Sequence, residues 1–293
     1  MSQPAITTLP ERAVLRLDGP DARGFLQGLI SNDVERLTAE NAVYAALLTP
    51  QGKYLFDFIL VADGDAILVD AEAARLPALL QRLTMYRLRS KVTLSAAADL
   101  AVCAAFGPGL DADLPQRGRV GDALIVADPR LPALGLRILL PRQNVEEFIA
   151  AHPLMQAQPE AYDRYRLDLG VPDGSRDLVI DKSILLESGF EELHGVAFDK
   201  GCFVGQELTA RTKYRGLVKK RLVPVEIDGP APESGTQVLA DGRDAGEMRS
   251  SRDGRGLALL RLEFLETAVP LVAGESRLRP VRPDWIVLPK AAG

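Results

Sequence analysis

The spacing of apolar residues in the first half of the chain changes repeatedly between the period of a β-strand and that of a helix. Residues 13–18 alternate as a strand, and a turn at 19–21 opens a helical pattern that ends near Ser31. Val43 to Leu48 and Tyr54 to Ala62 flank a turn and predict a β-hairpin, followed by a strand at 66–69. The mixture predicts an α+β fold with antiparallel sheets.

Helices are expected where leucines recur at helical spacing. Leu76, Leu79, Leu80 and Leu83 stand at i, i+3, i+4 and i+7, which predicts an amphipathic helix that covers the sheet. Further strands are expected at 91–94, 100–106 and 123–127, and further helices at 144–151 and 160–169. From residue 218 to 288 short β-type runs alternate with turns such as Asp241-Gly242 and predict a small barrel or sandwich.

Composition narrows the classes of protein. A chain of 293 residues with 47% apolar and 26% charged residues is long enough for two or three lobes. The net charge of −5 gives no overall attraction to nucleic acid or to an anionic membrane. The first ten residues lack a signal pattern, and no run of about 18 apolar residues occurs. We therefore expect a cytoplasmic protein without membrane association.

The chain has two cysteines and two histidines, and none of them shows metal-ligand spacing. Cys103 and Cys202 lie far apart, and His152 and His194 stand alone, so no metal site is expected. A [4Fe–4S] cluster needs four thiolates, which one chain with two cysteines does not supply.

The segment 199–216 is unusual because two glycines bracket Cys202 just ahead of a helix-forming stretch. If a helix spans Phe203 to Arg211, Cys202 lies at its N-terminus near Lys200, and both the helix dipole and the ammonium favour a reactive thiolate. The alternative is a buried, inert cysteine. Glu207 and Arg211 stand at i and i+4 and could either stabilise the helix or bind a ligand.

The string Lys200-Gly-Cys202-Phe-Val-Gly-Gln206-Glu207, followed by Ala-Arg211, closely resembles the motif of the YgfZ family. Gly19 to Val34 resembles the family's N-terminal helix and Ser-Asn-Asp-Val element, and Tyr86 to Val92 resembles its Tyr-x-x-x-x-Lys-Val segment. Leu217 to Val225 is similar to the branch that contains the mitochondrial iron–sulfur assembly factor.

This resemblance implies a three-lobed arrangement like that of the glycine-cleavage T-protein. The lobes would be residues 1–45 with 152–217, residues 46–151, and a C-terminal β-barrel at 218–293. It also implies a central tetrahydrofolate site and a role in keeping iron–sulfur proteins active, with those proteins or their assembly machinery as partners.

Asp57 is the only ionisable residue in the apolar strand from Tyr54 to Val61. Burial would raise its pKa and suit it to acid–base work or to binding a ligand amine, whereas strand aspartates near turns are often only hydrated. Gly52 to Leu60 resembles the aminomethyltransferase stretch that supplies the catalytic carboxylate, but Phe56 replaces the first aspartate of that stretch. This departure leaves transferase turnover in doubt.

Glu187 lies in a Leu-Leu-Glu-Ser-Gly element that resembles the T-protein segment whose glutamate grips the pterin. A carboxylate can accept paired hydrogen bonds from aminopyrimidine N–H groups, although a solvated loop glutamate is the plain alternative. With Asp57, Gln206, Glu207 and Arg211, it completes the expected folate-binding set.

Six basic residues and no acidic residue occur between positions 211 and 221. They are Arg211, Lys213, Arg215, Lys219, Lys220 and Arg221. Such a run forms a solvated face, attracts the anionic tail of folate, or binds RNA. Tyr214 is the only aromatic residue among them and the chain is acidic overall, which disfavours nucleic acid.

Three functions remain open from the sequence. The first is a folate-binding factor without classical turnover that supports iron–sulfur proteins through Cys202, with Lys200 beside it. The second is a tetrahydrofolate-dependent aminomethyl or one-carbon transferase that uses Asp57. The third and weakest is a role in RNA modification through the basic run.

Overall fold

The computed structural model describes residues 3–110, 117–265 and 269–288. The chain divides into two compact units. The first unit comprises Met1–Leu47, Phe56–Tyr162 and Leu193–Val204, and the second comprises Leu48–Leu55, Asp163–Glu192 and Gly205–Gly293. The expected division into three lobes at other boundaries stays a prediction.

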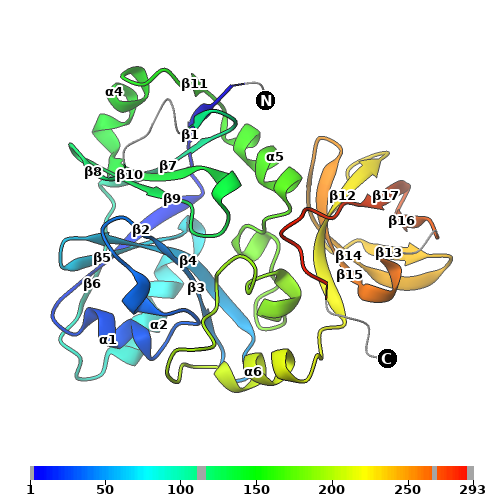
Figure 1. Cartoon of the computed structure of the whole chain (residues 1–293), viewed down its shortest axis with the longest axis horizontal. Helices are drawn as coiled ribbons and strands as arrows, with labels where there is room; N and C mark the ends of the chain where they lie inside the picture. Colours follow the sequence, from blue (N-terminus) through cyan, green and yellow to red (C-terminus); the bar gives the residue numbers. More distant parts are fainter. Residues whose placement is uncertain (1–2, 111–116, 266–268, 289–293) are drawn as a thin grey trace. The chain divides into compact units, whose positions relative to one another are not determined.

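The first unit contains two β-sheets (Figure 1). One is five-stranded, in the order β3-β4-β5-β2-β6. Its strands are β2 (Arg12–Asp18), β3 (Val43–Leu48), β4 (Tyr54–Asp63), β5 (Ala66–Glu72) and β6 (Thr93–Ala96). The predicted run of strands and hairpins is confirmed. Only β6 begins later than expected, because the Lys91 N–H donates to the Asp21 carboxylate (2.7 Å) and leaves the ladder to start at Thr93.

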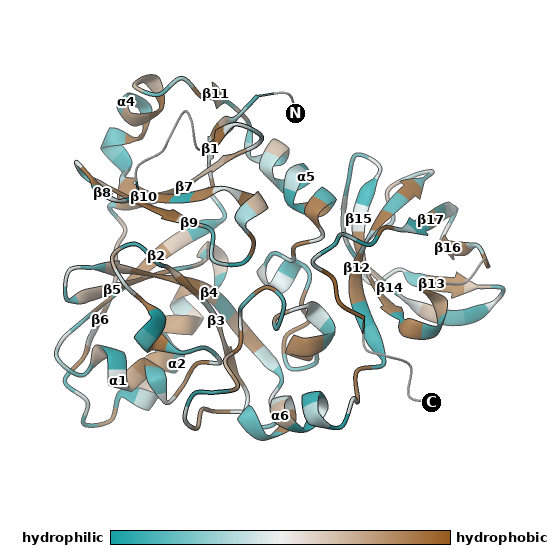
Figure 2. Ribbon diagram, in the orientation of Figure 1, coloured by the Kyte–Doolittle hydropathy of each residue, from teal (hydrophilic) through white to brown (hydrophobic). Residues whose placement is uncertain are grey.

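The other sheet of the first unit is six-stranded, in the order β11-β1-β7-β10-β9-β8. Its strands are β1 (Ala5–Thr8), β7 (Leu100–Phe106), β8 (Gly118–Val120), β9 (Ala123–Ala127), β10 (Leu136–Pro141) and β11 (Met155–Gln156). Figure 2 shows hydrophobic colouring along β7, β9 and β10. Cys103 is fully buried in this core, and burial raises the pKa of its thiol to about 12, so this cysteine is inert at neutral pH.

Short helices join the strands. They are α1 (Ala22–Gln27), α2 (Leu76–Arg87), α4 (Val145–Ala150), α5 (Pro159–Leu169) and α6 (Gln206–Tyr214). The predicted stripe on α2 is present, with Leu79 and Leu83 fully buried. Helix α1 ends earlier than the sequence predicts because the following residues join β3: Ile30 forms a β-bridge with Leu47 and the Ser31 N–H donates to Ala46 O (2.8 Å).

Buried ion pairs lie within and between the two sheets of the first unit. Arg12 on β2 donates to Asp70 on β5 (2.7 Å), and the second carboxylate oxygen of Asp70 lies 3.5 Å from Nη1 of Arg137 on β10. Nε of Arg137 also lies 3.1 Å from Oδ2 of Asp128, and Nη2 of Arg130 lies 2.7 Å from the same oxygen. Burial alone would raise the pKa of Asp128, but the two guanidinium groups lower it, so the carboxylate stays ionised. These charges are paired as buried charges must be.

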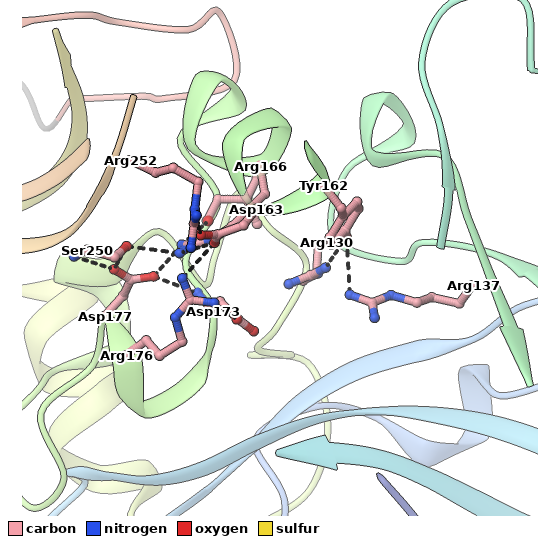
Figure 3. Close-up of polar contacts among 11 residues, drawn as sticks. Arg130, Arg137, Tyr162, Asp163, Arg166, Asp173, Arg176, Asp177, Ser250 and Arg252 are labelled. Carbon is pink, nitrogen blue, oxygen red and sulfur yellow. Dashed lines mark hydrogen bonds and ion pairs between the residues drawn. The ribbon is translucent and has the colours of Figure 1, made fainter. Parts of the chain in front are cut away.

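The phenol of Tyr162 completes this network. Arg130 and Arg137 both donate to its hydroxyl, at 3.3 and 3.2 Å, as Figure 3 shows. The Tyr162 ring meets Phe106 edge-on, with 5.2 Å between the ring centroids. A polar tip and an apolar body therefore tie α5 to strand β7.

A closed barrel forms most of the second unit, in the order β12-β15-β14-β13-β16-β17. Its strands are β12 (Lys220–Asp228), β13 (Gln237–Ala240), β14 (Arg243–Arg252), β15 (Arg255–Arg261), β16 (Leu271–Ala273) and β17 (Ser276–Pro280). Hairpin turns at Asp241-Gly242 and Asp253-Gly254 have positive φ at both residues, as the Asp-Gly pairs predict. The α+β class with a small C-terminal barrel is confirmed.

An ionic cluster fastens the barrel to the rest of the second unit (Figure 3). Arg166 on α5 binds the carboxylates of Asp163 and Asp177, and Asp163 also accepts from Arg252 on β14 (2.7 Å). Asp177 in turn accepts from the hydroxyl (2.5 Å) and backbone N–H (3.1 Å) of Ser250 on the same strand. Several charge-assisted hydrogen bonds thus hold one barrel strand in place.

Leu88, at the end of α2, has a strained backbone. Its φ of 44° and ψ of −108° lie in a region that a leucine rarely adopts. Its side chain is nevertheless 88% exposed, so burial does not compensate for the strain.

We predict that Leu88→Gly raises the free energy of unfolding by about 1 kcal/mol, because glycine adopts positive φ without a Cβ clash. Met85→Gly, three residues earlier and also exposed, should lower it by about 1 kcal/mol, because a helical glycine only adds backbone entropy. Urea unfolding of both variants measures the two signs. Destabilisation by Leu88→Gly would show that its backbone is not strained.

Candidate functional site

The loop that carries Cys202 is held by the side chain of Lys200. The Lys200 ammonium donates three hydrogen bonds, to the backbone carbonyls of Gln27 (2.7 Å), Ile30 (2.8 Å) and Asn32 (2.8 Å). An ammonium has three donors, so each one is used. The carbonyls that follow α1 therefore form a socket for the lysine of the Lys-Gly-Cys motif.

Burial lowers the pKa of Lys200 to about 8, against the opposing charge of Asp33. The amine is still mostly protonated at pH 7 and keeps its three bonds. Its geometry is that of an anchor for the loop. The predicted catalytic role of Lys200 beside the thiol stays a prediction.

The Ser31-Asn32 pair secures the segment that leads into this loop. The Ser31 hydroxyl donates to Gly195 O (2.6 Å), and the Asn32 amide donates to His194 O (2.6 Å) and to Tyr44 O (2.7 Å). Both side chains are buried, and each joins chain segments more than 160 positions apart. The Ser-Asn-Asp element, noticed in the sequence only as a resemblance, thus has a structural task.

Cys202 is exposed in the first unit. The expected placement of this cysteine at a helix N-terminus is wrong, because α6 begins only at Gln206. Gly205 precedes the helix with φ of 82°, and a Cβ at Gly205 would lie 2.5 Å from Thr49 O. The helix therefore begins after Gly205, and Cys202 lies in the preceding loop, where its side chain is exposed.

Asp57 lies inside the first unit on β4. It is 6% exposed and accepts a hydrogen bond from the Tyr44 hydroxyl (2.9 Å). Burial and the adjacent Asp57 charge raise the pKa of Tyr44 well above its usual value, so the phenol remains a donor. The expected burial of Asp57 is confirmed, and Tyr44 is a partner that the sequence did not indicate.

Glu187 belongs to the second unit, in a 3-10 turn over Leu185–Ser188. Burial raises its pKa, against the charge of Lys220 and hydrogen bonds from the backbone N–H groups of Lys220 and Lys219. The carboxylate is therefore half-buried and bonded to the start of β12, rather than fully solvated.

The remaining predicted ligand residues lie on α6 in the second unit. Gln206 is its first residue. Glu207 and Arg211 form the expected i,i+4 ion pair, with side chains 83% and 48% exposed. The structure brings these two together at the surface. Cys202, Lys200 and Asp57 belong to the first unit, so the whole predicted set is not in one unit.

The basic run is not a uniform free surface. Lys213 pairs with Glu191 (2.6 Å), and Arg221 is buried with Nη1 donating to Leu186 O (3.0 Å) and Nη2 2.8 Å from Glu192. These residues line a cavity of about 300 Å³ in the second unit. The acidic partners come from the segment just after Glu187, and the spacing of the basic residues gives no hint of them.

Within the described ranges, no group of three or more His, Cys, Asp or Glu residues could hold a metal ion. Among the same residues, no helix is long and apolar enough to cross a membrane.

Comparisons with known proteins show clear relatives. Residues 219–288 match the family described as CAF17, C-terminal beta-barrel domain. Over 94% of its length the chain is similar to proteins named iron–sulfur cluster assembly factor IBA57, mitochondrial, from Mus musculus (35% identity) and Homo sapiens (34%), covering 84% of each. A homologue with this name from Neurospora crassa is 34% identical, with 81% of this chain and 56% of that protein covered.

The fold resembles that of a solved enzyme, glycine cleavage system aminomethyltransferase T from Bartonella henselae. The TM-score is 0.75, with 97% of this chain and 87% of the enzyme covered. At 15% sequence identity this likeness shows the fold alone. The T-protein-like architecture expected from the sequence is confirmed.

The expectation of a cytoplasmic protein is contradicted by these comparisons. The relatives from Mus musculus, Homo sapiens, Neurospora crassa and Mycosarcoma maydis are all named as mitochondrial proteins. The absence of a signal pattern in the first ten residues does not decide the compartment of a protein.

We predict that Lys200→Met lowers the free energy of unfolding by about 3 kcal/mol, because three buried carbonyls lose their donor. Lys91→Met, an exposed lysine of the same unit, is the matched control and should change stability by no more than about 0.5 kcal/mol. Chemical denaturation compares the two. Equal stability of the two variants would show that the socket contributes nothing.

Proposed function

Because the chain belongs to the family of the iron–sulfur cluster assembly factor IBA57, we propose that it supports the assembly of iron–sulfur proteins through the thiol of Cys202. One observation carries the proposal. The two cysteines have opposite environments. Cys103 is buried with a raised pKa, whereas Cys202 is exposed on a loop that the side chain of Lys200 attaches to the backbone carbonyl of Ile30. We also propose that the chain belongs to the YgfZ family, whose motif it resembles from Lys200 to Arg211.

The thiol would act together with a partner. Iron–sulfur clusters are bound by thiolates, usually four to a cluster, and this chain offers one accessible thiol. Cys202 would therefore supply one thiolate, as a ligand or as a nucleophile, while the partner supplies the remaining ligands of the cluster. A loop that is anchored at its base presents such a thiol at a defined position without burying it.

Tetrahydrofolate binding is a second part of the proposal. The T-protein-like fold supports it, and the half-buried Glu187 is a suitable acceptor for the N–H groups of a pterin. Gln206, Glu207 and Arg211 on α6 belong to the same unit as Glu187 and would contact the rest of the ligand. In the first unit, Asp57 stays a predicted acceptor for a folate amine. The exposed Arg211 suits the anionic glutamate tail.

A folate-dependent aminomethyl or one-carbon transferase is the alternative, and one contact favours it. The Tyr44 hydroxyl fixes one oxygen of Asp57 inside the first unit, which is how an acceptor for a folate amine would be oriented. Turnover that survives Cys202→Ala and is lost with Asp57→Asn would establish this alternative. The pairing of Arg211, Lys213 and Arg221 with glutamates weakens the support for an RNA role.

We predict that Cys202→Ala lowers the activity of dependent iron–sulfur enzymes at least tenfold in cells that carry only the variant. Cys103→Ala is the control that also removes a thiol, and it should keep activity wherever the protein still folds. Thermal melting should show that Cys202→Ala is folded, because an exposed thiol contributes little to a core. Full activity of Cys202→Ala would refute the thiol function.

We predict that isothermal titration with tetrahydrofolate under anaerobic conditions shows binding that Glu187→Ala weakens at least tenfold. Removing a charged hydrogen-bond acceptor costs about 1.5–3 kcal/mol, which corresponds to that loss. Glu191→Ala, a neighbouring surface glutamate, and Cys202→Ala should leave the affinity unchanged. Absence of binding to folded wild-type protein would refute the folate site and leave the thiol function standing.

A further inference from the structure

We propose that Leu88 and Met85, with the basic residues around them, form a docking surface for a partner protein whose own surface has an apolar socket bordered by carboxylates. We call these two residues the apolar knob. This inference rests on the proposed function, because the partner that docks here is the one that meets Cys202.

The first argument is the exposure of the apolar knob. Leu88 is 88% and Met85 is 64% exposed, and both come from the same turn at the end of α2. Leu88 and its neighbours Arg89 and Ser90 also line an open surface hollow with Asp21. Single exposed apolar residues are common, but here one of them also has an unfavourable backbone conformation. A leucine that is both strained and exposed does not stabilise the free protein, and this points to a role in binding.

The second argument is that the loop is rigidly held. The Lys91 N–H donates to the Asp21 carboxylate (2.7 Å), and the Ser90 N–H donates to Arg87 O (2.8 Å). Gly19 lies so close to the loop that a Cβ on it would be 2.2 Å from Lys91 O. The knob is therefore preorganised, and binding would cost little loop entropy.

The third argument is charge. From residue 73 to 98 there are five basic residues and no acidic residue. They are Arg75, Arg82, Arg87, Arg89 and Lys91. Arg87, Arg89 and Lys91 next to the knob are exposed, although the whole chain has a net charge of −5. Even with the Asp21 carboxylate in the hollow, these three exposed cations select an acidic surface on the partner, and they disfavour an isologous contact in which two copies of this chain meet through the knob.

The fourth argument is the position of the knob within the first unit. Asp21, which holds the knob's loop, immediately precedes α1, and Gln27, whose carbonyl binds Lys200, ends it. Helix α1 has six residues and is about 9 Å long. The loop that carries the knob and the loop that carries Cys202 are therefore attached to opposite ends of the same short helix, and we place one folded partner on both.

The knob can be tested by site-specific photo-crosslinking. The full-length chain is produced in cells with benzoylphenylalanine in place of Met85 and irradiated, and the crosslinked protein is identified by mass spectrometry. Met155, a 40% exposed methionine of the same unit, is the matched control position. We expect an adduct with an acidic protein at position 85 that does not form at position 155.

The identified protein is then purified, and its affinity for the wild-type chain is measured by titration. Leu88→Asp should weaken binding at least tenfold, as should Arg87→Glu combined with Arg89→Glu, and 0.5 M salt should weaken binding to the wild type. Leu88→Gly should bind more weakly while being at least as stable to unfolding as the wild type. That combination separates loss of docking from loss of folding.

Several results would overturn the proposal. They are equal adducts at positions 85 and 155, an adduct with a second copy of this chain or with lipid, and an affinity that Leu88→Asp leaves unchanged. The function proposed for Cys202 is tested separately, because Cys202→Ala should keep the adduct while losing support of iron–sulfur enzymes. Retained support of these enzymes by Leu88→Asp would refute the link between the knob and the thiol.

Discussion

The ammonium of Lys200 imposes the constraint on which the candidate site depends. A buried cation must have every donor satisfied, and only a fixed set of backbone carbonyls can do this. The carbonyls of Gln27, Ile30 and Asn32 meet this need, so the end of α1 and the loop before Cys202 have to form together. The side chains of Ser31 and Asn32 likewise donate to the backbone carbonyls of residues 195 and 194, which attaches that segment as well.

The elements of the fold could be predicted from the sequence wherever local periodicity decides them. The hairpin of β3 and β4, the apolar stripe of α2 and the Asp-Gly turns of the barrel follow from neighbouring residues alone. The buried charges could not be predicted in this way. Arg12 and Asp70 are 58 positions apart, and nothing in the local pattern of either indicates the other. The pairing of β2 with β5 in one sheet brings these two residues together, and the packing of the second sheet adds Arg137.

The candidate site shows the same division. The Glu207–Arg211 pair and the burial of Asp57 could be predicted from the sequence, and the structure confirms both. The role of Cys202 stays a prediction, with its side chain exposed. The start of α6 lies three residues later than the sequence predicts, because Gly205 has a φ of 82° and its backbone is therefore not helical. The hydrogen bond from Tyr44 to Asp57 could not be predicted, because a tyrosine in an apolar strand is usually part of the core.

Residues that stabilise this protein and residues that are available to partners have opposite environments. The arginines and aspartates between the sheets are buried, paired and bonded, and replacing one of them would leave its partner charge unpaired. Cys202 and Leu88 are exposed, and the fold of the free chain gains little from either. The loops that carry them are attached to the two ends of one short helix, through the side chains of Lys200 and Asp21. Hydrogen bonds that hold the two loops in place favour recognition of a partner, because ordered loops lose less entropy on binding.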